Sequence, residues 1–159
     1  MPGVINDEMR EFLRREKFIF IATTNPNSDA NVAPKILLKI EGDDIYMADY
    51  VLNKTFKNLK RHARVSLGIV DPSTLYGYQF NGNTQVLTVG ADYKQLLNEL
   101  QEKATDLTIE SVIRSVRTGK KYVKEFAFSD QAAIFKIHVD EVVKITPSGY
   151  LERRKENGG

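Results

Sequence analysis

The sequence contains no cysteine and no tryptophan, and only two of its 159 residues are histidines. Without cysteine there are no disulfides, thiol nucleophiles or thiolate-bound metal clusters, and a reducing, cytoplasmic location is expected. His62 and His138 are far apart, and neither has a second ligand at metal-binding spacing, so no metal site is expected. The motifs of an elbow-type serine nucleophile, a P-loop and a dinucleotide-binding loop are also missing.

Long apolar runs and a strong net charge are missing too. No run approaches the roughly 20 residues that span a bilayer, and residues 1–10 lack the pattern of a secretory signal. The net charge of +2 is too small to indicate general affinity for nucleic acids or membranes. Residues 50–70 nevertheless carry five Lys or Arg and no acid, which suits an anion or else a solvated helix face. RNA binding is not favoured, because no aromatic stacking platform accompanies these cations.

Residues 49–59 predict a phosphate-binding corner. They follow the strand-like residues 44–48, and a helix is expected to open at Asn53, with Lys54 and Thr55 in its first turn. Helix starts offer unpaired N–H groups and a partial positive charge. Together with an ammonium and a hydroxyl group, these donors suit a phosphomonoester.

The hydrophobic pattern predicts a single mainly β domain over residues 1–150, followed by a polar, frayed tail over 151–159. The first three strands, joined by short turns, imply an antiparallel meander. Late helices added to many short strands indicate a closed β-barrel with helical additions, and an irregular segment over 117–130 could close over a site. Strands are expected at 18–24, 31–40, 45–48, 65–70, 75–89 (kinked at Asn81-Gly82), 132–139 and 142–145, and helices near 7–13, 53–62, 92–104 and 108–116.

Strand alternation within residues 34–40 suggests a ring-binding surface. Ile36, Leu38 and Ile40 would face the barrel core, which leaves Lys35, Leu37 and Lys39 on the other face. An apolar residue between two cations could hold the flat ring of a redox cofactor, although lysines on a solvent face are the alternative. Since the chain offers few groups for acid–base or nucleophilic chemistry, a reaction carried by a cofactor is favoured.

Six segments in this order resemble the FMN-binding split-barrel superfamily, which includes pyridoxamine 5′-phosphate oxidase and small FMN-binding proteins. The segments are residues 20–24, 32–39, 45–50, 53–59, 64–67 and 79–82. The resemblance implies a six-stranded antiparallel split barrel of Greek-key type. It also implies a homodimer with FMN at the subunit interface and electron transfer between the flavin and a small-molecule substrate.

The resemblance further implies a set of cofactor contacts. The isoalloxazine and ribityl chain would be bordered by Pro34, Lys35, Ile36 and Lys39, the ribityl-phosphate by Met47 and Ala48, and the phosphate by Lys54 and Thr55. Asn58 lies at a recurrent position where packing or capping is as reasonable as ligand contact. Candidates for the substrate side, with core packing as the alternative, are Tyr50, Tyr78, Phe126 and Phe128.

Two departures from the oxidase pattern matter for function. The oxidase's Ser-Arg-Lys triplet is replaced by Asn53-Lys54-Thr55, and its C-terminal substrate segment, with Arg and Trp, has no counterpart. Oxidation of vitamin B6 is therefore not expected. A non-catalytic binder or carrier of flavin, of the deazaflavin F420 or of haem is the alternative to an oxidoreductase.

Overall fold

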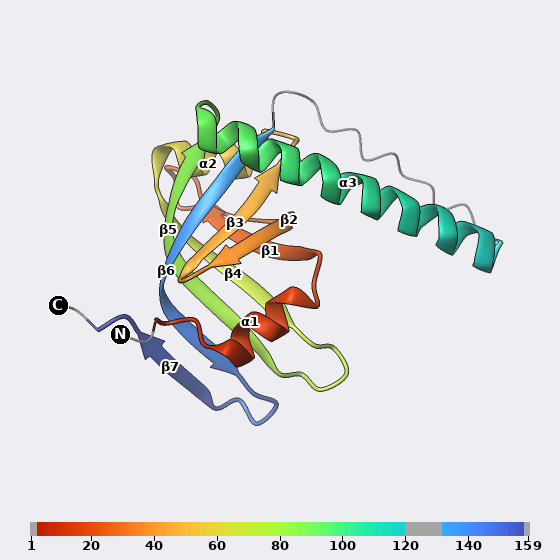
Figure 1. Ribbon diagram of the computed structural model, residues 1–159. Helices are drawn as coiled ribbons and strands as arrows, with labels where there is room; N and C mark the ends of the chain where they lie inside the picture. Colours follow the sequence, from red (N-terminus) through yellow and green to blue (C-terminus); the bar gives the residue numbers. More distant parts are fainter. Residues whose placement is uncertain (1–2, 120–131, 158–159) are drawn as a thin grey trace.

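The structure, a computed structural model, describes residues 3–119 and 132–157, which form seven antiparallel strands and three helices (Figure 1). The segment 120–131, with Phe126 and Phe128, lies outside the described residues. In chain order the elements are α1 (Asp7–Arg14), β1 (Phe18–Thr24), β2 (Ala30–Glu41), β3 (Asp44–Asp49), α2 (Lys54–Arg61), β4 (Arg64–Val70), β5 (Gly77–Leu87), α3 (Ala91–Thr118), β6 (Ala133–Ile145) and β7 (Leu151–Lys155).

The strands close into the predicted six-stranded barrel. Strand order is β3-β2-β1-β4-β5-β6-β7, and an additional pairing between β3 and β6 closes the ring. The predicted meander of β1, β2 and β3 is confirmed, and β4 returns to pair with β1, which is the Greek-key arrangement. The chain reaches β4 through α2, and this crossover places α2 at one end of the barrel.

An apolar core fills the barrel, and a short helix covers each end. Alternate residues of the strands point inward, among them Ile21, Leu67, Phe80 and Phe135, all fully buried. At one end α1 adds Met9 and Leu13 to this core, while at the other end α2 turns Thr55, Asn58 and Leu59 inward (Figure 1). The end under α2 is therefore partly polar, whereas the end under α1 is apolar.

Helix α3 lies against the outer face of the barrel. Its residues Tyr93, Leu96 and Leu100 pack with Ile36 and Ala48 in a second apolar cluster, and the helix then extends past the strands (Figure 1). The prediction of two helices over 92–104 and 108–116 is wrong, because one helix of 28 residues runs through both. Neither glycine nor proline interrupts this stretch, so nothing in the local sequence ends the helix between the two predicted segments.

Two β-bulges account for other differences from the predicted strands. Leu38 is an extra residue in β2, since Leu37 pairs with Met47 and Lys39 with Tyr46. Leu37 therefore enters the barrel core while Leu38 packs under α3, so the predicted face shared by Ile36, Leu38 and Ile40 is wrong.

The second bulge lies in β6 at Asp140, opposite Asn81 and Gly82, and β6 continues through it instead of ending at residue 139. The predicted single long strand over 75–89 is confirmed as β5. The expected frayed tail is wrong for Leu151–Lys155, which pairs with β6 as β7.

Candidate functional site

The connection from β3 to α2 is a tight loop held by Asp49. Oδ1 of Asp49 accepts a hydrogen bond from the backbone N of Val51 at 3.1 Å, which turns the chain out of the strand. Leu52 then adopts a φ of 50°, in the left-handed region that non-glycine residues rarely occupy. Local strain of this kind often marks a functional loop. The loop ends at Asn53, the N-cap residue of α2.

The N-terminus of α2 is suited to an anion. Asn53 makes no side-chain capping hydrogen bond, and the first turn carries no acidic residue. In α1, by contrast, the Asn6 side chain accepts from the N–H of Met9, and two acids occupy the first turn. Lys54 is exposed beside the uncapped turn of α2. The helix dipole and the Lys54 ammonium would both favour a phosphate group there.

A layer of buried polar side chains lies under α2. Asn31 donates from Nδ2 to Thr55 Oγ1 at 3.2 Å, and Asn58 donates from Nδ2 to Thr23 Oγ1 at 3.0 Å. Thr55 is only 2% exposed, so its side chain faces the barrel end while Lys54 faces solvent. Thr55 and Asn58 thus dock the helix on the barrel, and the structure does not bring the two predicted phosphate side chains onto one open surface.

Lys35 is a further buried polar side chain. Its Nζ lies 2.8 Å from Asp49 Oδ1 in an ion pair whose residues are 7% and 0% exposed. The other carboxylate oxygen of Asp49, Oδ2, is buried and has no partner among the described residues. Lys35 is therefore directed at Asp49 inside the barrel and not at the outer face where a flavin ring was expected.

The remaining predicted ring contacts are dispersed. Met47 is fully buried in the barrel core, whereas Ile36 and Ala48 are fully buried under α3. Pro34 is exposed on the outer face of β2, directly opposite Phe20 of β1. The side chains of Met47, Ile36 and Ala48 are thus buried within one chain, and of these four residues only Pro34 is exposed to solvent.

Lys39 lines a polar cleft between the barrel and the start of α3. The cleft has a volume of about 380 Å³ and is lined by Lys39, Glu41, Tyr46, Gln85, Leu87, Asp92, Gln95, Leu96 and Lys136. The ammonium groups of Lys39 and Lys136 lie 5.1 and 5.8 Å from the centroid of the Tyr46 ring. Hydrogen bonding to Glu41 raises the pKa of Lys39, and Glu99 adds to that effect. Lys39 is therefore a charged, compensated group at a cleft able to admit a small polar molecule.

An apolar surface lies on the outer face of β1, β2 and β4. Phe20 is 58% exposed, and Phe18, Val32 and Val70 are also exposed large hydrophobic residues. A groove of about 370 Å³ runs between Phe18, Phe20 and the end of β4. Large exposed apolar groups gathered on one sheet face are typical of an interaction surface.

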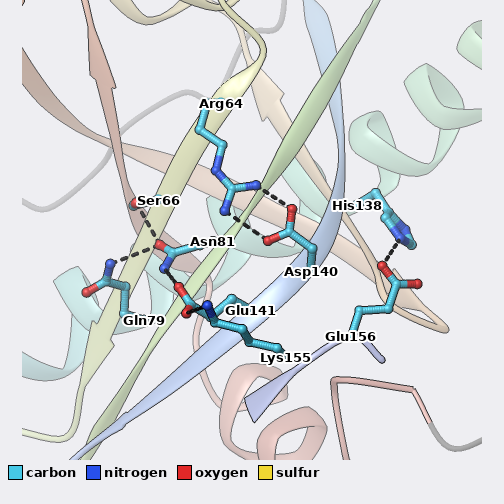
Figure 2. Close-up of polar contacts among 9 residues, drawn as sticks. All are labelled: Arg64, Ser66, Gln79, Asn81, His138, Asp140, Glu141, Lys155 and Glu156. Carbon is cyan, nitrogen blue, oxygen red and sulfur yellow. Dashed lines mark hydrogen bonds and ion pairs between the residues drawn. The ribbon is translucent and has the colours of Figure 1, made fainter. Parts of the chain in front are cut away.

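A polar network borders this apolar surface on β4, β5 and β6 (Figure 2). Oδ1 of buried Asn81 accepts from Ser66 Oγ at 2.7 Å and from Gln79 Nε2 at 2.9 Å, and its Nδ2 donates to Glu141 at 2.7 Å. Arg64 forms a two-point ion pair with Asp140 at the β6 bulge. The network fixes Gln79 and Asn81, which the sequence marked only as part of a motif.

Two further sequence candidates have clear positions. Tyr78 is buried in the barrel core, packs edge-to-face on Phe12 and donates its hydroxyl to Glu8 at 2.9 Å, so it serves the core. Tyr50 is 40% exposed in the loop before α2 and stays a candidate for contact with a ligand.

Asp49 is the main residue that sequence reasoning missed. The β2–β3 hairpin register, counted back from Glu41 opposite Asp44 and corrected for one bulge, places Lys35 opposite Asp49. This register would have predicted the ion pair if the bulge at Leu38 had been recognised in the sequence.

Among the described residues there is no group of three His, Cys, Asp or Glu able to hold a metal ion. No helix in the described part of the chain is both long and apolar enough to cross a membrane.

Comparison with known proteins gives a family match over most of the chain. The family model described as pyridoxamine 5′-phosphate oxidase matches residues 5–144. No curated protein matches the sequence.

Solved structures share the fold at low sequence identity. A protein from Clostridium acetobutylicum, related to general stress protein 26 of B. subtilis and described as of the pyridoxinephosphate oxidase family, has a TM-score of 0.68 and 14% identity, over 93% of this chain and 92% of that chain. A pyridoxamine 5′-phosphate oxidase-related, FMN binding protein from Nostoc punctiforme has a TM-score of 0.53 and 9% identity, over 94% and 92%. An F420 reductase has a TM-score of 0.57 and 14% identity, over 87% and 98%. At these sequence identities the three comparisons show a shared fold and nothing further about function.

Proposed function

The chain belongs to the pyridoxamine 5′-phosphate oxidase family, and on this premise we propose that it binds FMN noncovalently and acts as a flavin-dependent oxidoreductase. The observation that carries the proposal is the start of α2, where an uncapped first turn without acids lies beside the exposed Lys54. The related Nostoc protein is described as FMN binding, which agrees with this choice of ligand.

The residues divide into two roles under this proposal. The N–H groups of the first turn of α2 and the ammonium of Lys54 would bind the phosphate, and the layer under α2 would hold the helix in place. Bound FMN would supply the hydride chemistry, while the polar cleft at Lys39 would admit the small donor or acceptor. Oxidation of vitamin B6 is not part of the proposal.

A homodimer is part of the proposal. The exposed Phe18, Phe20, Val32 and Val70 would be covered by the second subunit, with the flavin at the interface. Pro34 and the network around Asn81 border the same face and would lie close to that interface. Native mass spectrometry should report a dimer with two FMN. A monomer at micromolar concentration would contradict the dimer.

FMN affinity tests the phosphate site directly. Lys54→Gln should weaken FMN binding by about tenfold, the usual effect of losing one charge-assisted contact. Lys60→Gln removes an exposed cation from the last turn of the same helix and should leave FMN affinity unchanged. Flavin fluorescence quenching gives both dissociation constants. Equal affinities for the two variants, or a wild-type protein that takes up no FMN, would refute the proposal.

A second candidate is binding of the deazaflavin F420, or flavin carriage without turnover. It is favoured by the fold shared with an F420 reductase. Mass spectrometry of the ligand extracted from purified protein distinguishes FMN from F420 and from haem. Steady-state reduction of the bound ligand by NADPH or NADH would identify an enzyme, and its failure with every donor tested would favour a carrier.

A further inference from the structure

We propose that Asp49 is the positioning residue of the phosphate loop and that Lys35 is its counter-charge, not a cofactor contact. This inference rests on the proposed function, since it concerns how the start of α2 is prepared for a phosphate. It reassigns Lys35, for which the sequence suggested contact with the flavin ring.

The first step of the argument concerns loop geometry. One atom, Asp49 Oδ1, accepts from both Val51 N at 3.1 Å and Lys35 Nζ at 2.8 Å. The Val51 bond turns the chain just before Leu52, whose left-handed backbone is otherwise unfavourable. Because Asn53, the N-cap residue of α2, follows one residue later, the carboxylate governs the direction in which the first-turn N–H groups point.

The second step concerns charge. A buried carboxylate five residues before Lys54, the first residue of α2, would oppose an anion bound there, and water screens buried charges poorly. Lys35 cancels that charge from β2, the strand opposite. The pair therefore permits a carboxylate to shape an anion-binding loop without repelling the anion.

The third step concerns the surroundings. Three of the six buried polar or charged side chains of the described residues, Thr23, Thr55 and Asn58, form the layer under α2. Asn31 joins them through Thr55. If the contact between α2 and the barrel were purely apolar, the helix could slide or rotate, whereas directional hydrogen bonds fix one orientation. The polar layer thus fits a helix whose N-terminus must keep a set direction.

The experiment compares FMN with riboflavin, which lacks the phosphate, so the ratio of the two dissociation constants isolates the phosphate contribution. The double variant Lys35→Met with Asp49→Asn removes both charges but keeps an oxygen acceptor for Val51. It should retain the wild-type ratio within about twofold. Lys35→Met with Asp49→Ala also removes the acceptor and should lower the preference for FMN by about tenfold.

The two single variants are a control, because they should change the ratio of the dissociation constants in opposite directions. Asp49→Asn leaves the Lys35 charge uncompensated and should raise the preference for FMN over riboflavin, whereas Lys35→Met should lower it. General loss of packing would weaken both flavins alike and would not change the ratio. A folded Asp49→Ala double variant with the wild-type ratio, or single variants that change the ratio in the same direction, would overturn the inference.

Failure of the proposed function is distinguishable from failure of the inference. If the wild-type protein binds neither flavin, the proposed function falls, and amide hydrogen exchange of the ligand-free protein still tests the loop. The Val51 amide should exchange at least about tenfold faster in the Asp49→Ala double variant than in the Asp49→Asn double variant. Equal exchange rates would contradict a positioning role for Asp49.

Discussion

Gly82 lies so close to His138 that a Cβ atom placed on the glycine would be 2.1 Å from the His138 carbonyl oxygen. The contact occurs beside the β6 bulge, where Gly82 pairs with Val139 and Asp140 is the extra residue. The close approach is between two backbones, so a rotamer change cannot relieve it. Glycine at position 82 is therefore a requirement of the bulged pairing between β5 and β6.

Substitution of this glycine should destabilise the barrel. Gly82→Ala is expected to lower the free energy of unfolding by about 3 kcal/mol, the upper part of the range for overpacking. Gly68→Ala in β4 is the matched control, because a Cβ there meets nothing within 4 Å. It should be neutral or stabilising by about 0.5 kcal/mol. Urea unfolding measures both, and equal effects would show that the close approach is not essential.

The Lys35–Asp49 pair predicts a non-additive stability effect. Lys35→Met leaves a buried carboxylate without its partner and should cost about 3–5 kcal/mol of folding free energy. The double variant Lys35→Met with Asp49→Asn should recover most of that loss, because no buried charge remains. Lys39→Met is the control, since its pairs with Glu41 and Glu99 are partly solvated and should be worth at most about 1 kcal/mol. Additive losses in the double variant would contradict the pairing.

His138 should make stability depend on pH. Its Nδ1 lies 2.8 Å from Asp44 Oδ1. Its Nε2 lies 3.6 Å from Glu156, on the chain just after β7 (Figure 2). Hydrogen bonding to Asp44 raises the pKa of His138 above its usual value, with a smaller contribution from Glu156.

A raised pKa in the folded state means that the stabilisation is complete below the unfolded-state pKa of about 6.5 and is lost as pH rises through the folded-state value. His138→Gln should therefore destabilise the protein most near pH 6 and progressively less towards about pH 8. His62→Gln, at the exposed end of α2, is the control for a histidine without these partners. A stability difference between wild type and His138→Gln that stays constant with pH would contradict the assignment.

The docking of α3 should depend on its first half. Leu100 is fully buried against the outer face of the barrel, and Leu100→Ala should cost about 2–4 kcal/mol. Ile109, which is 52% exposed farther along the same helix, should tolerate alanine within about 0.5 kcal/mol. Similar losses for the two variants in thermal unfolding would indicate that a further surface covers Ile109.

The barrel could be predicted because strong local signals agree. Turn residues and alternating apolar side chains mark β1 to β5, and these strands match the predicted ones within a few residues. The bulges could not be predicted in the same way. Leu38 has the same apolar character as its neighbours, so nothing local shows which residue is extra. The polar residues Asp140 and Glu141 indicated a boundary between two strands, whereas β6 continues through a bulge at this position.

The candidate site was predicted in part. The start of α2 at Asn53 and Lys54 is where the sequence put it, since a strand, a loop and an amphipathic helix follow one another. The orientation of Lys35 was not, because burial of a lysine depends on an acid that the fold brings from the next strand. Burial of Ile36 and Ala48 depends on α3, more than 40 residues away along the chain, and local pattern carries no such information.

β7 has one consequence for association between molecules. The six strands of the closed ring each pair on both sides, but among the described residues β7 pairs with β6 alone. The other edge of β7 carries unpaired backbone groups, and an apolar strand with such an edge could pair with a second molecule. The strand instead carries Glu152, Arg153, Arg154 and Lys155, and mutual repulsion between such edges should keep native molecules from polymerising through it.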